Sequence, residues 1–142
     1  MENQDNLQSG YKVINIFLMD SIFNRISQVT FEAEKLKPVL NIDIKTNFDN
    51  NKIIVSETLV YESIVNNIKE VTATITMLGV FEKFGDSPSV SPTDFGNING
   101  PAIIYPFIRE HLSSLSLKAG IGQLLIPPVN FVKKTQEEKG AE

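Results

Sequence analysis

The spacing of apolar residues in this 142-residue chain changes once, and that change most restricts the possible fold. Before residue 80, apolar side chains alternate with polar ones, as at Leu40, Ile42 and Ile44. Between residues 103 and 115 they recur instead at every third or fourth position. Alternation is typical of a strand with one buried face, and the longer spacing is typical of an amphipathic helix. We therefore expect an α+β fold, with the strands first and one long helix last.

Four segments have the composition and spacing of strands. The residues between the second and third segments (FDNN) and between the third and fourth (Asn66 and Asn67) favour turns. Because successive strands with short connections pair most readily side by side, the sequence predicts a four-stranded antiparallel sheet. The predicted strands are Tyr11–Leu18, Pro38–Thr46, Ile53–Ile64 and Val71–Leu78.

One long helix is predicted after a loop at residues 87–100, which is rich in Ser, Pro, Gly and Asn. Asn99 followed by Gly100 and Pro101 is a helix start signal, and Gly120 suits a helix end. Pro106 interrupts the pattern, so it either kinks this helix or marks its true first turn.

The two ends of the chain are polar, whereas the middle has the composition of a globular domain. Residues 1–10 (MENQDNLQSG) and 133–142 (KKTQEEKGAE) contain too few apolar side chains to offset the entropy lost on ordering. We expect a flexible lead over 1–10, one domain over 11–132, and a frayed polar tail over 133–142 that could add a short helix.

Composition also limits the compartment and the partner. The chain has no cysteine, which suits a reducing compartment. Its first residues lack the layout of a signal peptide, and no apolar run approaches the roughly 18 residues of a membrane span. The net charge of -4 disfavours nucleic acid as a partner, because phosphate binding needs clustered Lys and Arg. We predict a cytoplasmic protein with no membrane insertion and no nucleic-acid partner.

No residue pattern predicts catalysis or a bound metal. His111 is the only histidine, and it lies on the apolar face of the predicted helix. A catalytic role would need a nucleophile or a carboxylate brought to it by the fold, whereas a packing or interface role needs neither. The acidic residues lack the spacing of a metal-binding loop, and the chain has no Gly-rich phosphate loop. We predict that the protein is not an enzyme and uses no cofactor or metal.

An almost wholly apolar segment follows the predicted helix. In residues 122–131 (GQLLIPPVNF), Pro127 and Pro128 prevent both a continuous helix and a central strand. Such a segment can fold back as a cover over one face of the sheet. It can equally form the wall of a binding groove or of an oligomer interface. Its composition leaves both interpretations open.

Residues 103–131 (IIYPFIREHLSSLSLKAGIGQLLIPPVNF) resemble the most distinctive segment of the SecB family of protein-export chaperones. In that family, an aromatic-Pro-aromatic-x-Arg-Glu helix is followed by an apolar loop that closes on Pro-Val-Asn-Phe. Weaker similarities, such as Gly79-Val80-Phe81, extend the resemblance over roughly residues 11–131. The matching residues of the distinctive segment are Tyr105, Pro106, Phe107, Arg109 and Glu110, then Gln123, Leu124, Pro128, Val129, Asn130 and Phe131.

The resemblance implies a homotetramer, built as a dimer of dimers, that works without ATP. Such a chaperone binds unfolded preproteins in apolar grooves and passes them to the translocation motor SecA. The groove would lie between the loop after the helix and the neighbouring sheet. Its lining residues in this chain would be Leu40, Ile42, Ile44, Ile121, Leu124, Leu125 and Ile126.

The surface that would meet SecA departs from the family pattern. Asp20 matches one of the family's acidic docking residues, which implies a SecA contact there. Asn24 stands where a glutamate would be expected, and Thr74 stands where a strand acid would be. The alternative is a SecB-like chaperone dedicated to one client, such as an antitoxin, without SecA coupling.

Overall fold

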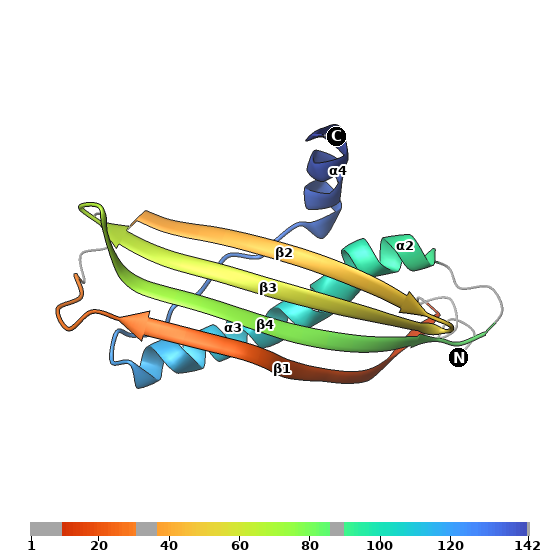
Figure 1. Ribbon diagram of the computed structural model, residues 1–142, viewed down its shortest axis with the longest axis horizontal. Helices are drawn as coiled ribbons and strands as arrows, with labels where there is room; N and C mark the ends of the chain where they lie inside the picture. The colour runs from red at the N-terminus through yellow and green to blue at the C-terminus, as the bar shows by residue number, and fades with distance from the viewer. Residues whose placement is uncertain (1–9, 31–36, 86–89, 142) are drawn as a thin grey trace, which may run out of the picture.

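The structure consists of a twisted sheet with a long helix along one of its faces (Figure 1). The computed structural model describes residues 10–30, 37–85 and 90–141. None of the helices within these ranges is both long enough and apolar enough to cross a membrane. The elements are β1 (Tyr11–Arg25), β2 (Lys37–Asp49), β3 (Lys52–Val65), β4 (Ile68–Lys83), α2 (Pro92–Asp94), the π-helical turn η2 (Phe95–Asn99), α3 (Gly100–Lys118) and α4 (Phe131–Ala141).

The four strands form an antiparallel sheet in the order β1-β4-β3-β2. The hairpin between β3 and β4 turns at Asn66 and Asn67, whose φ angles are 52° and 65°. Asparagine tolerates this left-handed region better than most residues, so the sequence suits the turn. The predicted antiparallel sheet and the α+β order are both confirmed.

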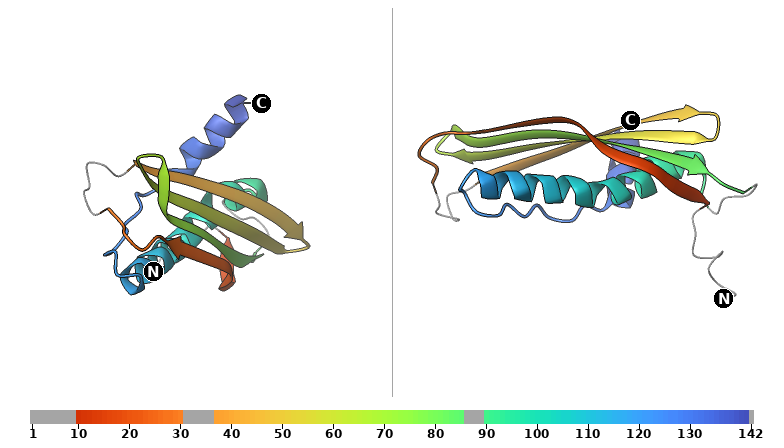
Figure 2. Two further views of the ribbon diagram at one scale, coloured as in Figure 1. Left: turned by 60° about the vertical axis from the view of Figure 1, so that its left-hand side comes forward. Right: turned by 90° about the horizontal axis from the view of Figure 1, so that it is seen from below.

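One face of the sheet forms the core together with α3. Alternate residues of the central strands point to this face, and Leu59 of β3 and Ile75 of β4 are fully buried there. The helix contributes Ile104, Ile108 and Leu112, which are spaced by four residues and are also fully buried. Figure 2 shows α3 along this face, while no described helix covers the opposite face. We call that opposite face the open face.

β1 is longer than its sequence predicts, because it continues past Leu18 to Arg25. Its pairing with β4 shifts register between Val13 and Asn15 and again between Leu18 and Asp20. Each shift leaves one unpaired residue in β1, so the side chains on either side no longer follow a simple alternation. The pattern of apolar residues therefore hides the second half of this strand.

The region before α3 is also more regular than the predicted loop. Ser91 Oγ accepts a hydrogen bond from Asp94 N at 3.2 Å, which caps the start of α2. α2 and η2 then lead directly into α3. Pro106 lies inside α3 rather than in its first turn.

Residues at the C-terminal end of the described chain form α4. Asn130 caps this helix, because its Oδ1 accepts a hydrogen bond from Lys133 N at 3.0 Å. Phe131 is buried against Tyr105, with ring centroids 5.8 Å apart and an edge-to-face geometry. The short helix allowed for the polar tail is therefore present and starts at Phe131.

Candidate functional site

A return segment, defined as residues 119–130, follows α3 and runs back alongside it (Figure 2). The segment turns at Gly120 and Gly122, whose φ angles of 73° and 81° lie in the region that favours glycine. Arg25 at the end of β1 donates a hydrogen bond from Nη1 to the carbonyl oxygen of Ala119. The end of α3 is therefore fixed to the β1 edge of the sheet where the return segment begins.

Two side-chain hydrogen bonds fix the rest of the return segment to α3. Ser116 Oγ accepts from Leu124 N at 2.9 Å and donates to the carbonyl oxygen of Ser113 at 2.9 Å. The Tyr105 hydroxyl donates to the carbonyl oxygen of Pro127. Because the segment is neither helix nor strand, these bonds to the helix set its distance from the sheet.

The space between the return segment and the β2 edge of the sheet forms a depression, which we call the β2 groove, and its central part is apolar. It contains three adjoining hollows. The central hollow, of about 220 Å³, is lined by Pro38, Leu40, Tyr61, Leu124, Leu125, Ile126 and Pro127. The α4 hollow, of about 470 Å³, is lined by Leu40, Asn41, Ile42, Val129, Lys134, Glu137 and Glu138. The inner hollow, of about 110 Å³, is lined by Val29, Thr30, Tyr61, Ser63, Val71, Ile121 and Leu124.

Six of the seven predicted groove residues lie at these hollows, and Ile44 does not. Ile44 is on the same face of the sheet, but it lies farther along β2, opposite Glu57.

The residues of the return segment differ sharply in the exposed fraction of their side chains. Ile126 is 3% exposed and belongs to the core, whereas Leu125 is 71% exposed. Leu125 is therefore free to contact another molecule, and whether the groove binds clients stays a prediction.

Two further contributions to the groove were not predicted from the sequence. Tyr61 lines two of the hollows, and the alternation of β3 could have placed it there because it shares a face with Leu59. The second is a clip on the chain that follows β1. Buried Glu70 accepts hydrogen bonds from Thr30 N at 2.7 Å and from Thr30 Oγ1 at 2.9 Å. This clip holds Val29 beside the inner hollow. No local sequence pattern predicts a contact between two residues that are 40 positions apart.

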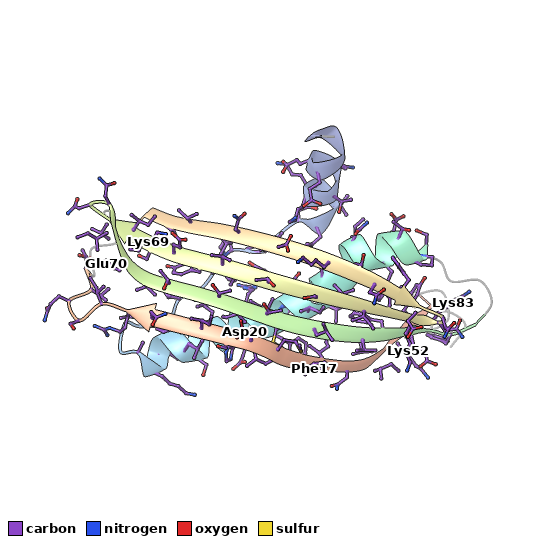
Figure 3. The ribbon with its side chains drawn as sticks, in the orientation of Figure 1. Phe17, Asp20, Lys52, Lys69, Glu70 and Lys83 are labelled. Atoms are coloured by element: carbon purple, nitrogen blue, oxygen red, sulfur yellow. The ribbon has the colours of Figure 1, made fainter. Side chains whose placement is uncertain are left out.

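Asp20, the predicted SecA contact, is on β1 and on the open face of the sheet (Figure 3). It lies opposite Thr76, while Asn24 lies opposite Thr72. At the centre of this face, Thr58 Oγ1 and Thr76 Oγ1 are hydrogen-bonded at 2.8 Å. The open face is thus rich in neutral hydroxyl groups around Asp20, and it is the side of the sheet away from the β2 groove.

His111 contacts β1 rather than the groove. Its Nε2 lies 2.8 Å from Ser21 Oγ, in an exposed position. No carboxylate among the described residues hydrogen-bonds to the other ring nitrogen, so the third group of a catalytic triad is missing from that part of the chain. The contact connects α3 to the edge strand.

Glu57, like Glu70, is an acidic side chain that is buried among the described residues, and it lies on the core face of β3. It is 0% exposed, and neither of its carboxyl oxygens has a hydrogen-bond partner among the described residues. Burial raises the pKa of Glu57 to about 8, and the positive charge of Lys134 on α4 acts in the opposite direction. Burial also raises the pKa of the Tyr105 hydroxyl above its ordinary value, against the effect of Arg109. At neutral pH the Glu57 carboxyl is therefore mostly protonated.

Comparison with known proteins gives consistent results. The model of a protein family described as preprotein translocase subunit SecB matches residues 4–140. A protein-export protein SecB of Marinobacter nauticus is 24% identical over 99% of this chain and 90% of its own length. One from Hahella chejuensis is 27% identical over 94% of this chain and 90% of its own. The structure of a SecB-like chaperone of Mycobacterium tuberculosis, solved in complex with a peptide from an antitoxin, superposes on this chain with a TM-score of 0.71. The two sequences are 16% identical, and the match covers 90% of this chain and 97% of the other. This last similarity shows that the two proteins share a fold.

Proposed function

The chain belongs to the SecB family of preprotein translocase subunits, and from this premise we propose that it is a chaperone that holds unfolded polypeptides for export. The observation that supports this activity is the β2 groove, whose central part is apolar and has Leu125 exposed at its rim. An extended apolar segment of a client would cover these side chains and remove them from water. None of the described residues that line the central hollow is charged, so the contact would select apolar character rather than a particular sequence.

A single groove of this size would hold a client weakly. Burying one leucine-sized side chain gains about 1.5–3 kcal/mol, whereas association costs at least about 4 kcal/mol in lost freedom. One or two client side chains in the central hollow would leave little net affinity. A chaperone of this type therefore needs several grooves acting on one chain.

An assembly of several copies would supply those grooves, and we propose a homotetramer built as a dimer of dimers. Edge strand β1 and the outer surface of α3 carry large apolar side chains that are about half exposed in one chain. Contacts of this kind between copies would bury them. The residues are Val13, Ile14, Leu18, Met19 and Ile22 on β1, and Ile103, Phe107 and Leu117 on α3.

Delivery to SecA in the cytoplasm is the finer part of the proposal, and Asp20 supports it. Asp20 is exposed on the open face, where a partner could reach it without entering the β2 groove. The second candidate is a chaperone dedicated to one client, such as an antitoxin, without SecA. The neutral residues Asn24 and Thr74 on the same face favour this second candidate.

The chaperone activity is tested by adding the purified protein to an unfolded client and following aggregation by light scattering. We expect suppression of aggregation by the parent protein, and its loss in Leu125→Asp and in the double variant with Leu124→Asp. The matched control is Phe48→Asp, which places the same charge on an exposed apolar position outside the three hollows. Equal activity of Leu125→Asp and the control would contradict a role for the groove.

The two candidates are separated by a binding measurement with purified SecA. Export delivery predicts saturable binding that Asp20→Ala weakens. The dedicated chaperone predicts no binding to SecA and a much higher affinity for one polypeptide than for unrelated unfolded proteins.

A further inference from the structure

The inner hollow is the smallest part of the β2 groove, and its walls come from separate parts of the chain. Its volume is about 110 Å³, against about 220 Å³ for the central hollow. Tyr61 and Leu124 line both hollows, so the inner one adjoins the central one. A client segment that lies in the central hollow could therefore place one side chain in the inner hollow.

Most walls of the inner hollow are held in place by the fold. The side chains that β3 and β4 contribute to it are buried, and close packing of the interior makes their displacement costly. The wall from the return segment is fixed by Ser116, whose Oγ accepts a hydrogen bond from Leu124 N and whose carbonyl oxygen accepts one from Ile121 N at 3.2 Å. The remaining wall is the connection after β1, residues 26–30, which we call the 26–30 loop.

Glu70 of β4 holds the 26–30 loop at both of its ends. At the start of the loop, Ile26 N donates a hydrogen bond to the carbonyl oxygen of Glu70 at 2.9 Å. At its end, the two carboxyl oxygens of Glu70 accept from Thr30 N at 2.7 Å and from Thr30 Oγ1 at 2.9 Å. Glu70 is only 5% exposed, and it lies at the end of the sheet where the chain leaves β1 (Figure 3). One buried residue therefore fixes the path of the whole loop.

Arg25 connects the 26–30 loop to the return segment. Its Nε donates to the carbonyl oxygen of Ile26 and its Nη2 to that of Ser27, both at 2.9 Å. Its Nη1 donates to the carbonyl oxygen of Ala119, where the return segment begins. Two walls of the inner hollow are thus joined through one guanidinium group.

Val29 is the apolar side chain that the 26–30 loop presents to the inner hollow. It is half-buried, packs against the core, and lines neither of the other two hollows. Because the clip fixes the backbone at the next residue, Val29 could withdraw only if Thr30 broke its hydrogen bonds to a buried carboxyl group. Leaving that carboxyl group without partners would be costly. The clip therefore fixes the size of the inner hollow.

A hollow of this size distinguishes apolar side chains by their volume. Four of its seven lining residues are aliphatic, which favours an apolar guest. An apolar cavity of about 150 Å³ accommodates benzene. The inner hollow, at about 110 Å³, is smaller. A branched aliphatic side chain can enter it, whereas an aromatic ring would have to displace Val29 or a buried wall.

We propose that the inner hollow is the specificity pocket of the β2 groove, which accepts an aliphatic side chain of the client and excludes aromatic rings, and that Val29 sets this limit. Thr30 and Glu70 act as positioning residues for Val29. This inference rests on the holding function proposed above, and it names the kind of segment that the groove holds. That segment is an extended apolar run with leucine, isoleucine or valine at the anchoring position.

The selectivity is tested by NMR titration with two synthetic peptides that differ at one position. Both contain the same alanine-rich segment, with leucine at its centre in one and phenylalanine in the other. We expect the parent protein to bind the leucine peptide about tenfold more tightly, which is the usual scale of discrimination by pocket size. Shifts of the Val29 methyl signals should accompany that binding, because the leucine side chain enters the hollow that Val29 lines.

Two substitutions of Val29 should change the preference in opposite directions. Val29→Ala enlarges the hollow, so it should remove most of the preference, mainly through tighter binding of the phenylalanine peptide. Val29→Ile fills the hollow, so it should weaken binding of the leucine peptide. The matched control is Val39→Ala, because Val39 is 48% exposed on β2 and lies outside the three hollows. This control should leave both affinities unchanged.

The positioning role of the clip is tested without any peptide. Thr30→Val removes the hydroxyl group that donates to Glu70, whereas Thr30→Ser keeps it. We expect Thr30→Val to increase the mobility of the Val29 methyl groups in NMR relaxation measurements, and to reduce the preference for the leucine peptide as Val29→Ala does. Thr30→Ser should change neither property. A Val29 side chain that is equally ordered in Thr30→Val would overturn the role of the clip.

The outcomes separate this inference from the proposed function. Equal affinity of the parent for the two peptides, or a preference that Val29→Ala leaves unchanged, would overturn the specificity pocket alone. Binding of neither peptide by a parent that still suppresses aggregation would also overturn the pocket, because clients would then be held elsewhere. A parent that binds neither peptide and does not suppress aggregation would overturn the proposed function, and the pocket with it.

Discussion

Gly79 in β4 lies where α3 comes closest to the sheet. A Cβ atom built on it would be 2.8 Å from Ile104 Cδ1 and 2.8 Å from the Phe81 ring. Both neighbours are fully buried, so neither can move without disturbing the packing around it. We expect Gly79→Ala to lower the free energy of unfolding by about 1–3 kcal/mol, measured by urea denaturation. In an Ile104→Val background, which removes the clashing methyl group, part of that loss should disappear, and equal losses in both backgrounds would refute this explanation.

Glu57 should make the stability of the protein depend on pH in the direction opposite to that of a paired carboxylate. Above pH 4.5 the unfolded chain loses this proton while the folded chain keeps it up to about pH 8, so rising pH favours unfolding. Glu57→Gln cannot ionise and should therefore gain stability relative to the parent between pH 5 and pH 8, by at most roughly 4 kcal/mol. Urea denaturation at pH 5, 6.5 and 8 measures this difference. Glu62→Gln on the same strand should show no such gain, and a Glu57→Gln effect that is constant with pH would contradict the assignment.

At the scale of elements, the sequence predicted those features that leave a repeating local pattern. The alternation of β2, β3 and β4 and the apolar stripe of α3 follow from burial of one face, so they can be recognised in a short window. β1 beyond Leu18 was missed because two bulges break its alternation. η2 was missed because its residues, rich in Gly and Asn, resemble a loop, whereas its structure depends on packing against the neighbouring helices and the sheet.

For the candidate groove, too, local features were predicted and contacts between distant residues were not. The apolar residues of the return segment were found because their composition has no other local explanation and because they resemble a known family. Tyr61 and the clip between Thr30 and Glu70 were not found, since both depend on contacts between distant parts of the chain. The buried state of Glu57 could not be predicted from the sequence, because its strand neighbours Thr58 and Ser56 give no sign that α3 packs against this strand.

Pro106 tests how α3 tolerates a residue that removes a helical hydrogen bond. A proline at this position cannot donate to the carbonyl of Ala102, yet α3 continues for twelve residues beyond it to Lys118. Pro106 is exposed, so its ring contributes little to the core of one chain. We expect Pro106→Ala to increase the free energy of unfolding by about 1–3 kcal/mol, measured on the same chain by urea denaturation. Loss of stability instead would show that the proline shapes α3 for its packing on the sheet.

At the scale of the whole molecule, the two proposed binding regions lie on different faces of one sheet. The β2 groove is on the side that α3 covers, near the β2 edge, whereas Asp20 is on the open face near the β1 edge. A client in the groove would therefore not block a partner at Asp20. Transfer of a client would then depend on competition for the client itself rather than on displacement of one partner by the other.

The proposed assembly of several copies gives the last prediction, because weak grooves become effective only when they act together. Phe107 on the outer surface of α3 and Phe48 at the far end of β2 are both 48% exposed, which makes them a matched pair. We expect Phe107→Asp to shift the protein from the proposed tetramer toward smaller species in sedimentation velocity experiments. The circular dichroism spectrum should change little, because the Phe107 side chain is not buried within one chain. The same variant should hold an unfolded client at least tenfold more weakly, because fewer grooves then act on one chain. Phe48→Asp should alter neither property, and a monomeric parent or a client affinity that is unchanged in Phe107→Asp would contradict the proposed assembly.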